Sequence, residues 1–309
     1  MNVFTLTLRD LEYLVAISDH AHFGRAALAV HVSQPALSTQ IRKVEQVLGI
    51  QIFERNNRRV AMTPIGKEII EQAKVVLDDA RKIEAIASQQ KAPLSGPLKL
   101  GAIASLGPYY LPHLLGPLQK AYPNTKLWLK EGLTDDLVAE LKAGTLDAIL
   151  ASPTFAADDL QLYPLFFEPF ILAVPKGHPL AHKKNLVASD LKASEMVLLE
   201  DGHCLKDQVL TLCTINRQSG NQQFQATSLE TLRHLVASGM GYSLLPNLAT
   251  HDNRQLKSLL IYRNFTDKKM GRKIVLVTRN RYYRQKDIAQ LASFLRNHLP
   301  SGVFPLKEL

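Results

Sequence analysis

The stretch at residues 91–97, which reads Lys-Ala-Pro-Leu-Ser-Gly-Pro, divides the chain into two parts whose apolar residues repeat with different periods. Prolines and a glycine this close together interrupt helices and strands, so the stretch predicts a hinge. Before it, apolar residues recur at helical spacing. Beyond it, apolar runs near 98–103, 126–130 and 146–150 alternate with helical patterns near 109–121 and 135–143. This alternation predicts an α/β domain that follows a helical one.

Three short helices are expected near the N-terminus, at residues 6–19, 23–30 and 34–48. Ser33 is suited to cap the third helix, Pro35 fits its first turn and Gly49 can end it. Two helices of these lengths joined by a short turn are typical of a helix-turn-helix. Two short strands at 50–53 and 59–62, around the basic tip 55–58, would add a wing.

The outward face predicted for the third helix is polar, and such side chains can read base edges while cations hold phosphates. Any helix that faces solvent can also be polar, so this face alone leaves both interpretations open. The net charge of +9 is compatible with a nucleic-acid partner, although the densest basic stretch, 254–296, is interpreted as a solvated surface. The candidate DNA-binding residues are Arg25, Ser33, Gln34, Pro35, Ala36, Ser38, Thr39, Gln40, Arg42, Arg55, Arg58 and Arg59.

A long amphipathic helix is expected from Pro64, which Thr63 precedes as a cap, to about residue 89. Its near-heptad apolar stripe consists of Ile65, Ile69, Val76, Leu77, Ala80, Ile83 and Ala87. A helix of this length with one apolar stripe is typical of helices that pair with a partner helix. The alternative is that the stripe packs against the helix's own domain.

The only two cysteines of the chain, Cys204 and Cys213, lie in different chemical settings. His203 and Lys206 flank Cys204, which we expect in the first turn of a short helix; a cation and a helix start both favour the reactive thiolate. Cys213 lies among leucine and isoleucine residues, which suggests burial. On a continuous helix the two Cα atoms would be roughly 13 Å apart, whereas a disulfide needs about 7 Å or less. The cysteines could pair only if that helix came apart; otherwise they are ordinary buried cysteines.

The composition argues against several classes of protein. No apolar run is long enough to span a membrane and residues 1–10 lack a signal-peptide pattern, so we expect a cytoplasmic protein. In that compartment a disulfide would be transient or sensory rather than structural. No His/Cys group has metal-ligand spacing, and no phosphate loop, dinucleotide motif or catalytic triad is visible. We therefore expect no metal, no cofactor and no enzymatic activity.

Two sets of motifs resemble one group of transcription regulators. FGRAA at 23–27, SQPALS at 33–38, FER at 53–55 and TPIG at 63–66 resemble the winged helix of LysR-type regulators. GHCLKDQ at 202–208, followed by Cys213, resembles the sensor segment of the hydrogen-peroxide-responsive OxyR family within that group.

The resemblance implies a domain organisation. An all-α winged helix-turn-helix would occupy residues 1–64, and a linker helix and hinge would occupy 65–91. An α/β effector domain at 92–309 would have two lobes related to periplasmic binding proteins. Lobe I would comprise about 92–166 and 269–302, and lobe II about 167–268.

The resemblance also implies roles for individual residues. Cys204 would be the peroxidatic cysteine and Cys213 the resolving one, joined in a reversible disulfide. The residues that would surround the peroxide are Ser105, Thr134, His203, Lys206, Asp207 and Arg272. Without the resemblance, Ser105 and Thr134 are interpreted as helix caps, and Asp207 as part of a surface ion pair, for instance with Lys206. Ser105 stands where the family commonly has Thr, and Lys206 where it commonly has Arg.

The function implied is peroxide-dependent activation of oxidative-stress genes. The expected partners are promoter DNA, hydrogen peroxide, further copies of the chain in a dimer or tetramer, RNA polymerase, and a thioredoxin- or glutaredoxin-type reductant. Oxidation would refold residues 201–220 and reorient the lobes. One alternative is a LysR-type regulator for a small metabolite bound between the lobes. The other is a thiol peroxidase, against which the winged helix argues.

Overall fold

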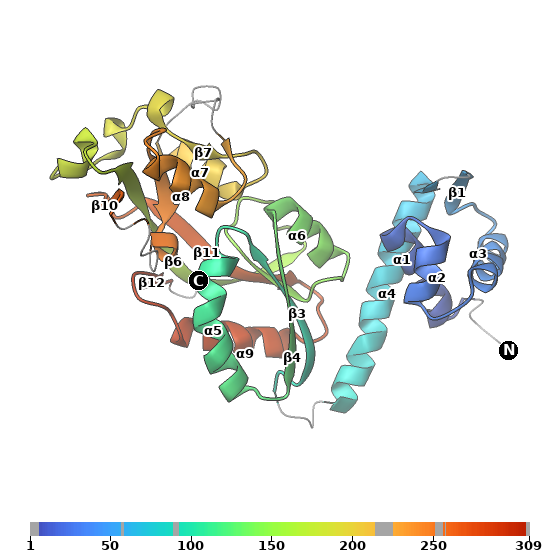
Figure 1. Ribbon diagram of the computed structural model, residues 1–309. Helices are drawn as coiled ribbons and strands as arrows, with labels where there is room; N and C mark the ends of the chain where they lie inside the picture. The colour runs from blue at the N-terminus through green and yellow to red at the C-terminus, as the bar shows by residue number, and fades with distance from the viewer. Residues whose placement is uncertain are drawn as a thin grey trace. The chain divides into compact units, whose positions relative to one another are not determined.

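The computed structural model describes residues 6–56, 59–88, 93–213, 225–250, 256 and 258–306. The chain forms two compact units, one built mainly on Met1–Lys91 and the other on most of the residues from Ala92 onward (Figure 1). The predicted hinge at 91–97 coincides with this division, although residues 89–92 lie outside the described ranges. Within the described ranges, no helix is both long enough and apolar enough to cross a membrane.

The N-terminal unit has a helical core with a short hairpin. Its elements are α1 (Leu8–His20), α2 (Phe23–Ala29), α3 (Gln34–Leu48), β1 (Phe53–Asn56), β2 (Arg59–Met62) and α4 (Pro64–Ser88). The side chains of Leu14, Leu37 and Ile41 are fully buried in its core. Ser33 caps α3 and Gly49, with φ of 68°, ends it, as predicted. The predicted helix-turn-helix is therefore confirmed as α2 and α3.

The first strand of the hairpin begins at Phe53, later than the predicted strand at 50–53. The reason is a carboxylate of α3. Glu45 Oε1 accepts hydrogen bonds from the backbone N–H groups of Ile52 and Phe53, at 2.9 and 3.1 Å. A helix side chain therefore binds the backbone N–H groups at the point where β1 begins. Residues 57 and 58, at the predicted wing tip, lie outside the described residues.

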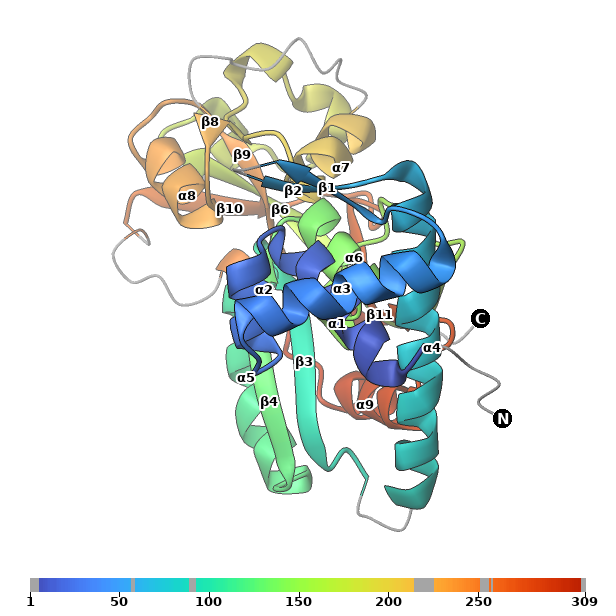
Figure 2. The same ribbon diagram turned by 90° about the vertical axis from the view of Figure 1, so that its right-hand side faces the viewer.

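The second unit is built on an eight-stranded sheet in the order β10-β6-β11-β5-β3-β4, with β9 and β12 also paired to β6. β3 is parallel to β4 and β5, and the other pairs of this sheet are antiparallel. Helices α6 and α9 pack against its strands (Figure 2). The strands are β3 (Gly96–Ile103), β4 (Thr125–Gly132), β5 (Ala148–Ala151), β6 (Leu160–Pro175), β9 (Ser243–Pro246), β10 (Leu260–Asn264), β11 (Gly271–Arg279) and β12 (Phe304–Pro305), with β7 (Leu198–Leu199) and β8 (Gln225–Ala226) in a separate pair. The helices are α5 (Gly107–Ala121), α6 (Thr134–Lys142), α7 (Cys204–Leu212), α8 (Leu229–Ala237) and α9 (Gln285–Asn297).

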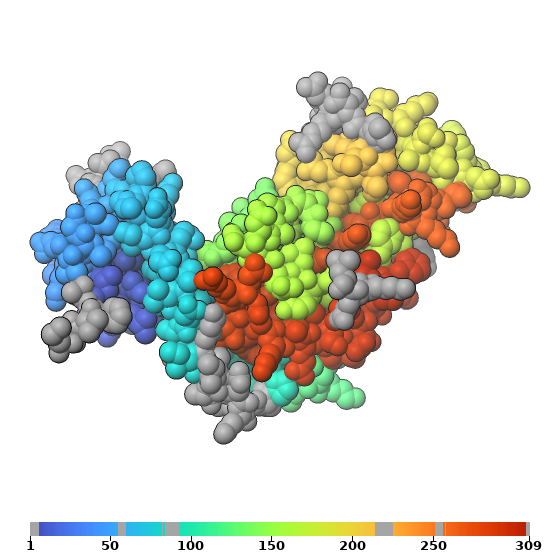
Figure 3. Space-filling view, turned by 180° about the vertical axis from the view of Figure 1, so that it is seen from behind, coloured from blue at the N-terminus to red at the C-terminus, as the bar shows by residue number. Residues whose placement is uncertain are grey.

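The 16-residue strand β6 is shared by two lobes. Up to Pro169 it pairs with β11, and from Phe170 onward it pairs with β9 and β10. We call lobe I the part that contains β3, β4, β5 and the first half of β6. Lobe II contains the second half of β6, β9, β10 and the β7–β8 pair; Figure 3 shows its surface in yellow and orange next to the green and red of lobe I. The change of partner lies at the end of the predicted crossover, 167–169. The predicted fold class, α/β with an N-terminal winged helix, is confirmed.

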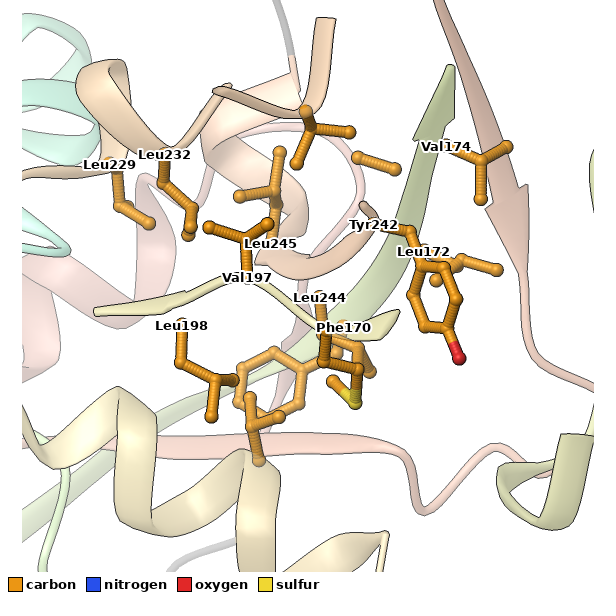
Figure 4. Packing of buried hydrophobic residues seen from close by; sticks show 14 of the residues in the cluster. Phe170, Leu172, Val174, Val197, Leu198, Leu229, Leu232, Tyr242, Leu244 and Leu245 are labelled. Atoms are coloured by element: carbon orange, nitrogen blue, oxygen red, sulfur yellow. The ribbon is translucent and has the colours of Figure 1, made fainter. Parts of the chain in front are cut away.

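The core of lobe II also anchors α7. Its residues on β6 and β9 are Phe170, Leu172, Val174, Leu244 and Leu245 (Figure 4). Leu205, Val209 and Leu210 of α7 join this cluster and are 2%, 2% and 3% exposed. Burial of each such side chain contributes about 1.5–3 kcal/mol. The apolar face of α7 therefore fixes the side on which its polar residues lie.

Candidate functional site

Three buried hydroxyl groups follow the ends of neighbouring parallel strands in lobe I. Ser105 comes after β3, Thr134 after β4 and Ser152 after β5, and all are at most 4% exposed. In the register, Ile103 pairs with Gly132, and Ala102 pairs with Leu150. Because parallel strands end at the same edge of a sheet, the three hydroxyls lie along one edge, in the order of their strands.

Helix α7 and the turn before it contact this edge from lobe II at two points. At its start, a Cβ on Gly202 would lie 3.0 Å from Cδ1 of Leu133, so the turn before α7 touches the residue that precedes Thr134. One turn further on, Gln208 Nε2 donates to Ser152 Oγ at 2.6 Å. The helix therefore spans from the end of β4 to the end of β5. Along the chain Cys204 lies between Gly202 and Gln208, and β3, which leads to Ser105, lies between β4 and β5 in the sheet.

Cys204 is the first residue of α7 and is 6% exposed. His203 occupies the N-cap position, is also buried, and makes no side-chain capping bond. The first turn of a helix presents unsatisfied N–H groups and the positive end of the helix dipole. The predicted position of Cys204 at a helix start is confirmed.

A buried arginine holds the hydroxyl of Ser105. Arg272 Nη1 donates to Ser105 Oγ at 2.6 Å, and its Nη2 donates to the Ser105 carbonyl oxygen at 2.9 Å. Its Nε donates to Glu168 Oε2 at 2.9 Å, and both side chains of this ion pair are fully buried. Because Ser105 Oγ accepts from Arg272, its own proton remains available for another acceptor.

Replacement of Arg272 with alanine should destabilise the protein strongly. The change leaves the Glu168 carboxylate buried without its cation, which costs about 3–5 kcal/mol. Urea unfolding of the full-length protein measures the loss. The matched control is the double variant Arg272→Met with Glu168→Gln, in which no charge is left unpaired and much of the stability should return. Equal losses in the single and double variants would contradict the ion-pair interpretation.

Thr134 has a buried hydroxyl that no described residue hydrogen-bonds. It is the first residue of α6, but the N-cap is Leu133 and no side chain caps the helix. Ser105 does not cap α5 either, because the N-cap there is Leu106. The interpretation of Ser105 and Thr134 as helix caps is therefore wrong. A buried, unsatisfied hydroxyl costs about 1–3 kcal/mol, which a bound molecule at Thr134 would recover.

Lys206 pairs with Asp201 rather than with Asp207. Its Nζ lies 2.8 Å from Asp201 Oδ1, and the lysine is 9% exposed. Adjacent residues on a helix do not face each other, and Asp207 is exposed on α7. A surface ion pair of Lys206 with Asp207 was one possibility from the sequence, and the ion pair that the structure records for Lys206 is with Asp201. A role of Asp207 in binding peroxide stays a prediction.

Cys213 lies at the opposite end of α7 from Cys204, as its C-cap. It is half-buried against the lobe II core rather than fully buried. Both cysteines are free thiols. Burial raises the pKa of the Cys213 thiol to about 11. At neutral pH, Cys213 is therefore protonated and a poor nucleophile while α7 is folded.

The raised pKa of Cys213 gives a pH-dependent expectation. In a Cys204→Ser variant, alkylation of Cys213 by iodoacetamide should be slow at pH 8 and should rise as the pH approaches 11, because only the thiolate reacts. In urea the same thiol should react at pH 8 at the rate of a model thiol, whose pKa is about 8.5. Equal rates in folded and unfolded protein at pH 8 would contradict this expectation.

Three residues of the site had no role in the sequence interpretation: Ser152, Glu168 and Gln208. Signals for two of them existed. Glu168 is the only charged residue in the apolar run 165–170, and a lone charge in such a run is commonly paired. Gln208 follows Cys204 by four residues, which places both on one face of a helix. Ser152 has no comparable signal, since its partner is 56 residues away.

The candidate DNA-binding residues surround the start of α3. Arg25, Ser33, Gln34, Pro35, Ala36, Thr39 and Arg42 are exposed, and Ser38 is half-buried. Gln40 was predicted to face outward, but its Nε2 donates to Asp10 Oδ1 at 2.7 Å, so this prediction is wrong. Burial would raise the pKa of Asp10, but the hydrogen bonds from Gln40 and Thr7 outweigh it and lower that pKa. The side chains of Arg55, Arg58 and Arg59 lie outside the described part of the structure.

Comparison with known proteins identifies the two units. Residues 8–67 match the family described as bacterial regulatory helix-turn-helix protein, lysR family, and residues 91–300 match the LysR substrate binding domain. The hydrogen peroxide-inducible genes activator of Dickeya chrysanthemi is 40% identical over 294 residues, which cover 95% of this chain and 96% of that protein.

Two solved structures are similar in fold and sequence. A full-length cysteine-to-aspartate variant of OxyR from Pseudomonas aeruginosa matches with a TM-score of 0.86 and 36% identity, over 99% of both chains. A cysteine-to-serine variant of Corynebacterium glutamicum OxyR with bound hydrogen peroxide matches with a TM-score of 0.65 and 34% identity, over 96% of this chain and 93% of that one. On these matches, which extend over nearly its whole length, the chain belongs to the hydrogen-peroxide-sensing OxyR family of LysR-type transcriptional regulators.

Proposed function

We propose that this protein senses hydrogen peroxide through Cys204 and Cys213 and changes its binding to promoter DNA in response. The observation that carries the proposal is the position of Cys204 at the start of α7, in a helix that contacts lobe I at Leu133, next to Thr134, and at Ser152. Arg272 orients the hydroxyl of Ser105, and the hydroxyl of Thr134 has no partner among the described residues. Such a site can hold a small molecule rich in hydroxyl groups directly beside a thiol.

The first chemical step is attack of the Cys204 thiolate on one oxygen of hydrogen peroxide. An S–O bond forms, the O–O bond breaks, and the second oxygen leaves as hydroxide, which takes up a proton to become water. The sulfur is oxidised to a sulfenic acid and the peroxide is reduced. Ser105 and Thr134 donate hydrogen bonds to the leaving oxygen, and the guanidinium behind Ser105 strengthens its hydroxyl as a donor.

The second step joins the two cysteines. The Cys213 sulfur attacks the sulfenic sulfur of Cys204, an S–S bond forms, and the S–O bond breaks with release of water. Exchange with a dithiol of the thioredoxin or glutaredoxin type restores both thiols and leaves the reductant as a disulfide. Since each molecule of protein then consumes one peroxide and waits for a reductant, we propose a regulator rather than an enzyme.

The linker helix α4 supplies a candidate dimer surface. Part of its apolar stripe is buried in its own unit, as Leu77 shows at 7% exposure. Ile65, Val76 and Ile83 remain 45%, 37% and 71% exposed. These positions repeat at intervals of two and three helical turns, so they share a face that a second α4 can cover. We propose a homodimer through α4, further assembled as a tetramer, that binds promoter DNA and contacts RNA polymerase.

Replacement of the exposed Arg42 with alanine should weaken DNA binding to all sequences. With one phosphate contact fewer, binding of the variant to DNA releases about one counterion fewer. The slope of log affinity against log salt concentration should therefore become less steep by about 1. Fluorescence anisotropy at several salt concentrations measures it. The control is Gln40→Ala, whose amide is bound to Asp10 and which should leave the salt slope unchanged. If log affinity falls with log salt concentration at the same slope in the parent protein and in Arg42→Ala, Arg42 does not contact a DNA phosphate.

The central test is mass spectrometry after one equivalent of hydrogen peroxide. A linked pair of peptides that contain Cys204 and Cys213, with DNA binding altered in parallel, is the expected result. If both thiols stay intact and a small metabolite changes DNA binding instead, the protein is a metabolite-sensing LysR-type regulator. Repeated turnover of peroxide with unchanged DNA binding would establish a thiol peroxidase.

A further inference from the structure

An open pocket of about 720 Å³ lies where the chain passes between the two lobes. We call it the crossover pocket. Its walls come from the middle of β6, from the segment between β10 and β11, from the short 3-10 helix η4 (Asn247–Thr250) and from β12. Much of its lining is apolar, and the apolar residues include Phe167, Phe170, Phe265, Met270 and Phe304. A volume of this size and a mainly apolar lining are typical of sites for small organic molecules.

Two phenylalanines form one wall of the crossover pocket. Phe304 on β12 pairs with Phe167 on β6, so the two side chains lie next to each other on one face of the sheet. Phe304 is 59% exposed. A Cβ on Gly271 would lie 2.4 Å from Cζ of Phe167, so the ring of Phe167 lies against the backbone of β11, where only a glycine leaves room for it. The pocket therefore presents an aromatic surface to a ligand.

The crossover pocket is separate from the peroxide site. Glu168 on β6 binds Arg272, which in turn binds Ser105. Successive side chains of a strand point to opposite faces of the sheet. Phe167 and Pro169, which line the pocket, therefore lie on the face of β6 opposite to Glu168 and its partners.

Helix η4 connects the two sites. The backbone N–H of Leu248 donates to Glu168 Oε1 at 3.0 Å, so this helix is held by the carboxylate that also binds Arg272. The preceding residue, Asn247, lines the crossover pocket, and its Nδ2 donates to the carbonyl oxygen of Gly302 at 2.9 Å. A molecule in the pocket would therefore contact the same turn of chain that contacts the buried ion pair.

The polar residues of the crossover pocket favour an anion. Lys268 lines the pocket, is exposed, and has no ion-pair partner among the residues that the structure describes. The neighbouring carboxylate is partly occupied, because Asp267 Oδ1 accepts a hydrogen bond from the Lys269 N–H at 2.8 Å. The net charge of +9 adds a general attraction for anions. An aromatic wall and an available ammonium group together match an aromatic ring that carries a carboxylate.

We propose that the crossover pocket binds a small aromatic carboxylic acid and that the bound acid favours one arrangement of the lobes. The ring packs against Phe167 and Phe304, and the carboxylate pairs with Lys268. A ligand shifts an equilibrium only as far as its affinities for the two states differ. The acid must therefore bind the reduced and the oxidised protein with different affinity. This second part rests on the proposed function, because it requires oxidation to reorient the lobes.

Isothermal titration calorimetry of the reduced full-length protein with phenylacetate tests the site. Phe304→Ala should weaken binding by about tenfold, the effect of losing one aromatic contact. Lys268→Gln should weaken it by up to about fivefold, the upper range for an exposed ion pair, and should leave binding of the neutral phenylacetamide unchanged. The matched control is Leu259→Ala, which removes a side chain that is also exposed, at 48%, but lies outside the pocket, and which should not alter binding.

Absence of saturable binding, or equal affinity in the parent protein and in Phe304→Ala, would overturn the proposed site. The same titration of the protein with a Cys204–Cys213 disulfide should give an affinity that differs by at least about threefold from that of the reduced form, a modest value for coupling between two sites. Equal affinities for the two forms would overturn the coupling to the lobes. If peroxide produces no disulfide, the proposed function fails, whereas the titration of the reduced protein still decides whether the crossover pocket binds the acid.

Discussion

Replacement of Cys204 with serine should abolish the peroxide response of this protein. A serine hydroxyl is not ionised at neutral pH, and its oxygen cannot be oxidised to the equivalent of a sulfenic acid. The second thiol cannot take over, because burial raises the pKa of Cys213 to about 11 and leaves it protonated at neutral pH. Both the disulfide and the peroxide-dependent change in DNA binding should therefore disappear, as measured by mass spectrometry and anisotropy.

The matched control is Cys213→Ser. This variant should still react with peroxide at Cys204, and dimedone should trap a sulfenic acid there, but no intramolecular disulfide should form. After treatment with peroxide, this variant should bind DNA as the reduced parent protein does, or change its DNA binding only in part. If Cys204→Ser and Cys213→Ser lose the reaction with peroxide equally, the assignment of peroxidatic and resolving roles is incorrect.

The predictions from the sequence were most reliable where a local pattern determines the structure. Ser33 and Gly49 mark the ends of α3, and the start of α7 at Cys204 follows from the turn residues before it. Gln40 was assigned to the wrong face because its partner, Asp10, lies 30 residues earlier and the helical pattern of α3 contains no information about it.

The site depends on long-range contacts, which periodicity does not reveal. Ser105 and Arg272 are 167 residues apart, and their hydrogen bond joins the turn after β3 to β11, two strands that β5 separates in the sheet. Glu168 lies directly opposite Arg272 in the register of β6 and β11, so the buried ion pair is a consequence of strand order. The resemblance to the OxyR family placed Ser105 and Arg272 near the thiol, whereas the residues alone indicated only a helix cap and a surface cation.

The unpaired hydroxyl of Thr134 shows why the structure was needed to interpret the residue. Threonine at a helix start is normally an N-cap, but here Leu133 has the N-cap position, and Thr134 lies one residue further into α6. No side chain caps α6, and the hydroxyl of Thr134 is buried without a partner among the described residues. A difference of one position therefore separates a structural residue from one available to a ligand.

Oxidation should unfold most of α7, and this is the largest structural change that we expect. The helix has nine residues between the turn at Gly202 and Cys213, and it separates the two cysteines by roughly 13 Å, against about 7 Å at most for a disulfide. A bond between them therefore requires the intervening backbone hydrogen bonds to break. The bond from Cys213 N–H to the Val209 carbonyl oxygen, 3.0 Å long, is one of these.

Unfolding of α7 also withdraws Leu205, Val209 and Leu210 from the lobe II core, where they are at most 3% exposed. Each loses about 1.5–3 kcal/mol if it stays in water. The oxidised protein must therefore bury these side chains elsewhere, and this requirement can select a second arrangement of the lobes. Loss of the bond from Gln208 to Ser152 would release α7 from lobe I in the same step.

Hydrogen exchange on the reduced and oxidised protein measures this change. Amide protection over α7 should fall by about 100-fold or more on oxidation, the equivalent of about 2.7 kcal/mol, which is comparable to the burial of one of these leucines. Helix α8 is a matched control, because it also has nine residues and packs in the lobe II core but contains no cysteine. Protection in α8 should change much less than in α7. Equal protection of α7 in both forms would mean that the disulfide, if it forms, does not act by refolding this helix, and that peroxide control must reach the DNA-binding domain by another route.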